Sequence, residues 1–218
     1  YKSLEVLKKN FINFIEKTPS FGKVFICLDD KNNQQVIKKI RNLNYNTYGI
    51  NKSSNFKILN VLQKESYSKF DLEISLPGAK KNFIKNIKIP LIGLHNIRNS
   101  TAAAAVAFSV GIPVKIIKKG LEKFSGVQRR FTKVFSYQNV SFFDDYAHHP
   151  TEITEVLNGV KQVYKKKEII CVFQPHRISR LKNLQEEFSK SFKEADTVIL
   201  CPIYKAGENI KLGFSYNS

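Results

Sequence analysis

The chain has 218 residues, 42% of them hydrophobic, and no apolar run approaches the ~18–20 residues that a transmembrane helix needs, so we expect no membrane association. The formal net charge of +18 raises a basic nucleic-acid-binding α/β domain as one function class. However, 30 of the 36 basic residues are lysine, and they are spread along the chain without a stripe of interleaved aromatics, which favours a compositional bias over a nucleic-acid partner. The oligomeric state is left open.

The three cysteines, Cys27, Cys171 and Cys201, are isolated on apolar runs. They show neither metal-site spacing nor a disulfide framework, which indicates a reducing compartment, and we expect the cytoplasm. The start of the chain has no signal-peptide pattern. The sequence also contains no methionine, so we expect it to be an interior piece of a longer chain.

Strands and helices are expected to alternate along the chain, which is typical of an α/β fold. Apolar residues from Leu4 to Ile15 recur at helical spacing, so the first helix is expected over residues 3–17. A buried strand over residues 24–28 follows and ends at two aspartates. Further helices are expected over residues 33–42, 102–110 and 114–124, and further strands over 46–50, 56–61, 70–76 and 87–92.

Ser125 and Gly126 interrupt this pattern, and we place a domain boundary there, with one domain over residues 1–126 and a second over 127–218. In the second domain, Pro150 is expected in the first turn of a helix, where a missing N–H is harmless. Its strands are expected over residues 131–135, 140–143, 169–173 and 197–201, and a single helix is expected to carry Leu181, Leu184, Phe188 and Phe192 on one face.

Two carboxylates and two imidazoles crowd a strand-to-helix loop in the run from Phe142 to Glu152. Ligands bind beyond the carboxyl ends of strands in α/β sheets, so this loop is a candidate site. The pattern leaves three readings open: binding of a ribose or an amine, N-terminal capping of the following helix, and the metal site of a hydrolase. The residues concerned are Asp144, Asp145, His148 and His149.

A second polar loop, from Gln174 to Arg180, follows the strand over residues 169–173. If this strand and the strand over residues 140–143 are parallel neighbours, both polar loops open at the same edge of the sheet. Arg177 and Arg180 are spaced i and i+3 near a helix start, where the helix dipole also favours an anion. Arginine retained in a lysine-rich chain favours a carboxylate or phosphate ligand over a solvated basic face.

A third candidate is His95-Asn96 with Asn99, which precedes an alanine-rich helix. Side-chain amides at i and i+3 share one helix face, and each offers a donor and an acceptor to the edge of an adenine. The alternative is ordinary N-capping by asparagine.

Taken together, four runs resemble the Mur ligases: His95–Asn99, Gly126–Phe131, Asp144–Glu152 and Phe173–Arg177. The similarity covers almost the whole chain. It implies the C-terminal portion of a central ATP-binding domain, followed by the first part of a Rossmann-like C-terminal domain. It also implies that the phosphate loop, the UDP-sugar domain and the end of the last domain lie outside this sequence, so we expect the chain alone to be inactive.

Within the family, the Phe173–Arg177 run and the ending Tyr204–Glu208 are most similar to the member that acts on UDP-N-acetylmuramate and L-alanine. The resemblance implies an ATP-dependent carboxylate–amine ligase of peptidoglycan precursor synthesis, which works through an acyl phosphate and uses Mg²⁺. It assigns no metal ligand here and leaves open which histidine accepts a proton; the catalytic candidates are His148, His149 and Arg130. By the resemblance, His95, Asn96 and Asn99 contact adenine, Arg130 contacts the phosphates or ribose, Asp145 contacts the ribose, and His148, His149, His176, Arg177 and Arg180 line the amino-acid pocket.

Overall fold

A computed structural model describes residues 3–41 and 44–208. The chain forms two compact units, Tyr1–Ser125 and Gly126–Ser218. Both units combine strands with helices, which confirms the expected α/β class. Of the described helices, none combines the length and the apolar character that crossing a membrane requires.

The N-terminal unit is built on one mixed sheet of five strands in the order β1-β2-β3-β4-β5. The strands β1, β2 and β3 are parallel, whereas β4 and β5 are antiparallel to their neighbours. Only two residues join β3 to β4, and so short a loop allows antiparallel pairing only. The strands are β1 (Val24–Cys27), β2 (Tyr45–Gly49), β3 (Phe56–Lys64), β4 (Tyr67–Ile74) and β5 (Asn82–Ile89).

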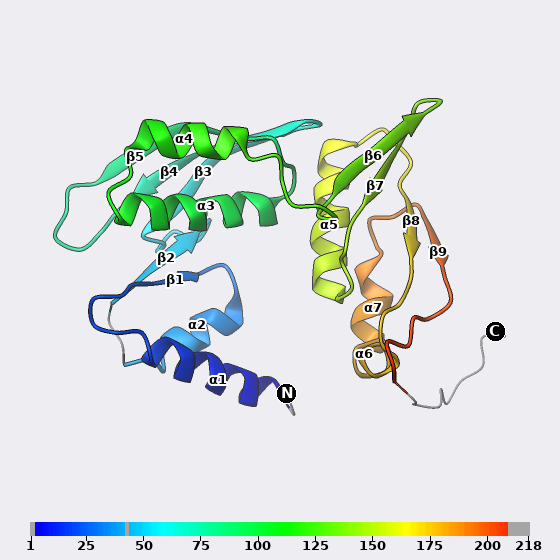
Figure 1. Ribbon diagram of the computed structural model, residues 1–218, viewed down its shortest axis with the longest axis horizontal. Helices are drawn as coiled ribbons and strands as arrows, with labels where there is room; N and C mark the ends of the chain where they lie inside the picture. The colour runs from blue at the N-terminus through cyan, green and yellow to red at the C-terminus, as the bar shows by residue number, and fades with distance from the viewer. Residues whose placement is uncertain (1–2, 42–43, 209–218) are drawn as a thin grey trace. The chain divides into compact units, whose positions relative to one another are not determined.

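Helices cover both faces of the sheet because side chains alternate along its strands. On β1, Phe25 packs into the core under α3 and α4, whereas Val24 and Ile26 pack with α1 and α2. Figure 1 shows α3 and α4 lying along one face of the sheet. On β4 every second residue from Ser68 to Ile74 is buried. The helices are α1 (Leu4–Glu16), α2 (Lys31–Ile37), α3 (Leu94–Ser109) and α4 (Val114–Lys123).

The strand expected over residues 87–92 is wrong in its bounds, because β5 already begins at Asn82. Ile84 and Ile87 are three apart, yet both are almost fully buried. An irregularity in the pairing with β4 leaves Asn86 at φ 56°, and the Asn86 N–H donates to Asp71 Oδ1 at 2.7 Å. This bulge breaks the two-residue alternation that would have revealed the first half of the strand.

The second helix begins earlier than expected, at Lys31 instead of residue 33. Asp30 is its N-cap, and its carboxylate accepts hydrogen bonds from the N–H groups of Asn32 and Asn33 at 2.7 and 3.1 Å. The helix ends at Ile37, and the expected end near Asn42 lies outside the described residues.

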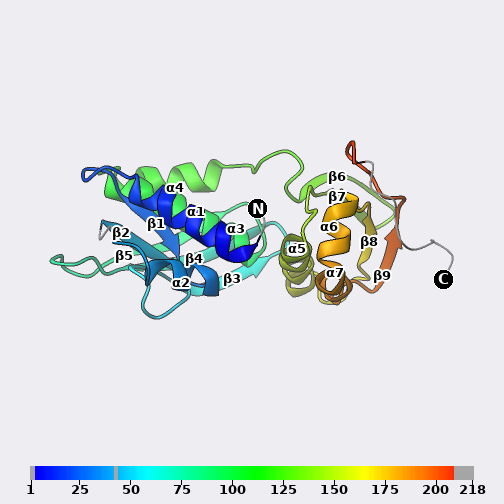
Figure 2. The ribbon, with the colours of Figure 1, turned by 90° about the horizontal axis from the view of Figure 1, so that it is seen from below.

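The C-terminal unit has two small sheets, an antiparallel β6-β7 hairpin and a parallel β8-β9 pair. Gln138 and Asn139 both have positive φ, which a two-residue hairpin turn of type I′ requires. Helices α5 and α7 pack side by side over one face of β8 (Figures 1 and 2). The elements are β6 (Thr132–Tyr137), β7 (Val140–Asp144), α5 (Pro150–Val163), β8 (Ile170–Phe173), α6 (Ile178–Asn183), α7 (Gln185–Ser191) and β9 (Thr197–Leu200).

In this unit the condition on strand pairing stated above is not met, and one expectation is wrong. The strands β7 and β8 are not paired neighbours, because β7 pairs with β6 and β8 pairs with β9. The single helix expected through Leu184 is broken there, with φ −126° and ψ 30°, into α6 and α7. The apolar stripe survives the break, since Leu181, Leu184 and Phe188 all join the same core. The spacing of the apolar residues therefore predicted which side chains pack into the core, but it did not predict the break in the helix at Leu184.

Candidate functional site

The side-chain amides of Asn96 and Asn99, in the N-terminal unit, lie within the first turns of α3. Gly93 is the N-cap with φ 91°, so the alternative that Asn96 or Asn99 caps the helix is wrong. The ring of His95 lies against Gly93, where a Cβ would come within 2.5 Å of the imidazole Cε1. Asn96 donates from Nδ2 to the Ile92 carbonyl at 2.7 Å, and Asn99 is exposed on the next turn. The Asn96 amide oxygen can therefore accept a hydrogen bond from a ligand, and the Asn99 amide can both donate and accept one.

An ion pair that was not predicted from the sequence ties α3 to the sheet. Arg98 donates from Nε to Asp29 Oδ2 at 2.8 Å, and the same carboxylate accepts the N–H groups of Ile50 and Asn51 at 3.1 and 2.9 Å. Burial would raise the pKa of Asp29, but these bonds outweigh it and lower that pKa. Gly49 has φ 144°, and a Cβ there would collide with the Asp29 carboxylate. The sequence did contain a sign of this ion pair, because Arg98 is one of only six arginines and lies between Asn96 and Asn99.

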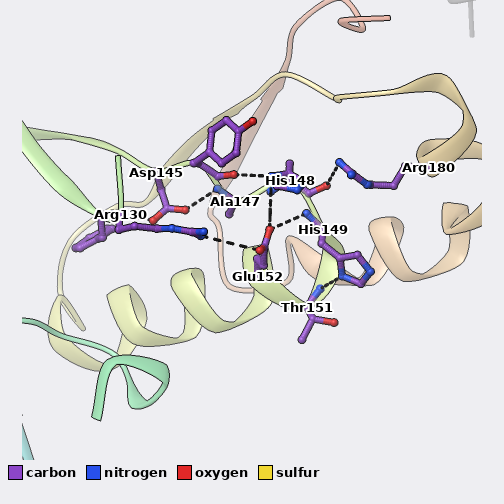
Figure 3. Close-up of polar contacts among 10 residues, drawn as sticks. Arg130, Asp145, Ala147, His148, His149, Thr151, Glu152 and Arg180 are labelled. Atoms are coloured by element: carbon purple, nitrogen blue, oxygen red, sulfur yellow. Dashed lines mark hydrogen bonds and ion pairs between the residues drawn. The ribbon is translucent and has the colours of Figure 1, made fainter. Parts of the chain in front are cut away.

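In the C-terminal unit, Asp145 organises the loop after β7 (Figure 3). Its Oδ2 accepts from the Phe131 N–H and its Oδ1 from the Ala147 N–H, both at 2.7 Å. Asp144 instead pairs with Arg129, Oδ2 to Nε 3.3 Å. The metal-site reading receives no support, because residues 3–41 and 44–208 contain no group of three His, Cys, Asp or Glu side chains arranged to hold an ion.

The N-cap of α5 is His149, so the expected alternative of helix capping is confirmed for this member of the group. Its Nδ1 accepts from the Thr151 N–H at 3.3 Å, while Glu152 Oε2 accepts the N–H groups of His148 and His149 at 3.0 and 3.2 Å (Figure 3). Burial alone would raise the pKa of Glu152, but these bonds and the nearby positive charge of Arg130 lower it. The Arg130 guanidinium stays half exposed, with Nη1 4.0 Å from Glu152 Oε1.

The two polar loops meet even though β7 and β8 are in different sheets. The ring centroids of His148 and His176 are 5.9 Å apart. Arg180 reaches the backbone of both loops, and its Nη1 donates to the carbonyls of His148 and His176, each at 3.4 Å. The imidazoles of His148 and His176 and the guanidinium of Arg180 are therefore neighbours in one cluster.

The hydrogen bonds of His148 define its tautomer. Its Nδ1 lies 2.8 Å from the carbonyl of Tyr146, which only accepts, so Nδ1 carries the proton. Glu152 Oε2 lies 3.8 Å from the same nitrogen. In the neutral ring Nε2 then has a free lone pair and can take a proton from an amine.

The ring of His176 also lies near the ring of Tyr204, and their centroids are 5.3 Å apart. Burial and the charges of Arg180, His148 and Arg177 lower the pKa of His176, so it is neutral at neutral pH. Its buried Nδ1 has no hydrogen-bond partner among the residues that the structure describes.

The two arginines of the second loop are placed differently. Arg177 is the N-cap of α6 with φ 70°, its side chain is exposed, and its N–H donates to the Tyr204 carbonyl at 2.9 Å. Arg180 is half-buried. The expected anion at the helix start is supplied by the protein itself, because the carboxylate of Glu208 accepts the N–H of Ser179 at 3.0 Å. The helix start is therefore already occupied, and an external anion would have to bind to the guanidinium groups.

Known protein families match both units. The model of the Mur ligase middle domain matches residues 1–107, and that of the Mur ligase glutamate ligase domain matches residues 129–214. Over all 218 residues the chain is 62% identical to a UDP-N-acetylmuramate--L-alanine ligase of Pelagibacter ubique and covers 47% of it. With 98% of its length, it is 40% identical to the enzyme of that name from Bartonella quintana and covers 45% of it. The chain thus spans about half the length of the curated relatives it matches.

Solved structures agree with these matches. The crystal structure of UDP-N-acetylmuramate-alanine ligase from Thermotoga maritima aligns with a TM-score of 0.61 at 26% identity, over 81% of this chain and 42% of that one. Folylpolyglutamate synthetase from Lactobacillus casei aligns with a TM-score of 0.63 at 17% identity, over 92% of this chain and 48% of that one, which shows a shared fold alone.

Proposed function

The chain belongs to the Mur ligase family, and on that premise we propose that it is part of an ATP-dependent ligase that joins L-alanine to the carboxylate of UDP-N-acetylmuramate. In this reaction a carboxylate oxygen takes the terminal phosphoryl group of ATP, and ADP leaves. The alanine amine then attacks the acyl carbon, phosphate leaves with the bonding electrons, and the amine loses a proton.

Each unit, taken by itself, has side chains that suit one part of a nucleotide. Asn96 keeps its amide oxygen for the adenine amino group, and the exposed Asn99 is one turn further along the same face, beside His95. Each carboxylate oxygen of Asp145 accepts one backbone N–H, and each has a second lone pair that can accept a hydrogen bond from a ribose hydroxyl. The half-exposed guanidinium of Arg130 suits the phosphates or the ribose.

Mg²⁺ is expected with ATP, and it is assigned to no side chain of the described ranges, which contain no cluster of metal ligands. Its role would be to neutralise the phosphates during transfer.

His148 is the best placed proton acceptor. With Nδ1–H bonded to the Tyr146 carbonyl, its Nε2 is the basic nitrogen, and the Glu152 carboxylate, 3.8 Å from Nδ1, stabilises the charged ring that results from proton transfer. His149 instead uses its Nδ1 as a helix cap. The neutral ring of His176 adds a hydrogen-bonding group beside the amine without repelling an ammonium ion.

Arg180 and Arg177 bind the alanine carboxylate in this proposal. Both bonds of Arg180 to backbone carbonyls use Nη1, so Nε and Nη2 can still form a bidentate pair with a carboxylate. The observation that carries the proposal is the contact between the loop before α5 (residues 145–149, the histidine loop) and the loop after β8 (residues 174–180, the arginine loop). An amino acid requires a proton acceptor for its amine beside a group that binds its carboxylate, and this contact supplies both.

The test is a hybrid of the Pelagibacter ubique ligase in which residues 1–218 replace the matching segment of that relative. We expect phosphate release that requires ATP, UDP-N-acetylmuramate and L-alanine together, with one alanine added to the product by mass spectrometry. Phosphate release that does not depend on alanine, or binding of an oligonucleotide without ligation, would contradict the proposal.

A further inference from the structure

We propose that Glu208 is a positioning residue, which fixes the start of α6 and thereby aims Arg177 and Arg180 at the substrate carboxylate. This inference rests on the proposed function and deepens it. Glu208 follows β9, at the end of a loop that the function above does not use.

The contact between Glu208 and α6 is made by both carboxylate oxygens. Oε2 accepts the backbone N–H of Ser179 at 3.0 Å, and Oε1 accepts the Ser179 hydroxyl at 2.5 Å. Hydrogen bonding by that hydroxyl and N–H, together with the charge of Arg177, lowers the pKa of Glu208, so it is ionised at neutral pH. A charged acceptor of this kind makes a stronger hydrogen bond than a neutral one.

The helix start needs this partner. Arg177, the N-cap of α6, has φ 70° and makes no capping bond with its side chain. The first N–H groups of a helix lack acceptors within the helix itself. Glu208 supplies one from 29 residues away, and Ser179, which it holds, lies between the two arginines in the chain.

The loop that carries Glu208 is itself held against the arginine loop. Arg177 donates its N–H to the Tyr204 carbonyl, and Tyr204 donates its N–H to the Pro175 carbonyl, each at 2.9 Å. Positive φ angles at Ala206 and Gly207 then turn the chain so that Glu208 reaches α6. The two loops after β8 and β9 thus form one support, and Glu208 is its charged contact.

The experiment uses the hybrid ligase with Glu208→Gln. The neutral amide removes the charge and one acceptor, so we expect the KM for alanine to rise about ten- to a hundredfold. The KM for ATP is expected to change less than about twofold, because Glu208 touches no group assigned to the nucleotide. Glu208→Asp keeps the charge and should recover part of the loss. Glu187→Gln removes an exposed carboxylate from the same unit and serves as the matched control.

Ser179→Ala provides a second test that spares the fold, since it deletes only the hydroxyl. We expect a smaller rise in the KM for alanine, and no further rise when it is combined with Glu208→Gln. If Glu208→Gln does not fold, Ser179→Ala decides: an unchanged KM for alanine overturns the inference. The inference is also overturned if the Glu208→Gln enzyme has the same KM for alanine as the Glu187→Gln control, or if Glu208→Gln changes the KM for alanine and the KM for ATP equally. A hybrid without substitutions that never adds alanine would instead refute the proposed function.

Discussion

The two units hold their polar side chains by different means. In the N-terminal unit, Asn96 and Asn99 are carried by a long helix that packs on a five-stranded sheet over a large apolar core. In the C-terminal unit, the histidines and arginines are on loops between short elements, and carboxylates that accept backbone N–H groups fix these loops. Adenine recognition is thus expected to depend on packing, and alanine recognition on a few charged hydrogen bonds.

The largest effect is expected from breaking the packed core of the N-terminal unit. Phe70 is 1% exposed on β4, and Phe70→Ala should lower the free energy of unfolding by ~3–5 kcal/mol, since it removes buried apolar surface and leaves a cavity. Denaturant unfolding of the chain measures this. Phe83→Ala on β5, where the ring is 46% exposed, is the control and should cost less than about 1 kcal/mol.

Neutralising a loop carboxylate is expected to cost less stability than Phe70→Ala but to impair alanine binding. Glu152→Gln weakens the bonds to the N–H groups of His148 and His149 and should cost ~1.5–3 kcal/mol. In the hybrid ligase, the KM for alanine should rise more than the KM for ATP. Glu168→Gln, at an exposed position of the same unit, should change neither. An unchanged KM for alanine would show that the loop does not need this carboxylate.

Asp29→Asn tests the one place where the N-terminal unit also relies on a charged contact. The substitution weakens the bond to Arg98 on α3, and we expect a cost of ~1–3 kcal/mol and a higher KM for ATP, with the KM for alanine unaffected. Glu122→Gln removes an exposed ion pair with Lys88 and should cost ~0–1 kcal/mol. If both variants lose equal stability, Asp29 is not a special anchor of α3.

The smallest effect is a shift in titration. Positive neighbours disfavour protonation of His176, so Arg177→Gln should raise its pKa, which NMR titration of the ring can follow. Because the folded-state pKa is depressed, the unfolded chain binds more protons between the folded and ordinary histidine values, and stability should rise with pH across that window. Arg41→Gln in the other unit is the control. A lower or unchanged pKa in Arg177→Gln would contradict the account.

Local patterns in the sequence predicted most helices and strands, and the reasons for the failures are physical. The bulge at Asn86 hid half of β5, and the kink at Leu184 left the apolar stripe of two helices looking like one. The sequence did not reveal the strand pairing either, because β8 pairs with β9, which is later in the chain. Neither bulges nor pairing partners are encoded by the spacing of apolar residues.

The candidate site was predicted only where its residues are close in the sequence. The histidine and arginine runs were found, whereas the partners that hold them were not. Arg98 and Asp29 are 69 residues apart, and Ser179 and Glu208 are 29 apart. Such contacts depend on how strands and loops meet in space. The roles of the ten site residues in binding and catalysis stay predictions.

One measurement tests the central claim most directly, that the arginine loop binds the amino-acid carboxylate. In the hybrid ligase, Arg180→Lys keeps the charge but loses the planar fork that makes a bidentate pair. We predict that the KM for alanine rises about tenfold or more, while the KM for ATP stays within about twofold. Equal changes in the two KM values would contradict the account.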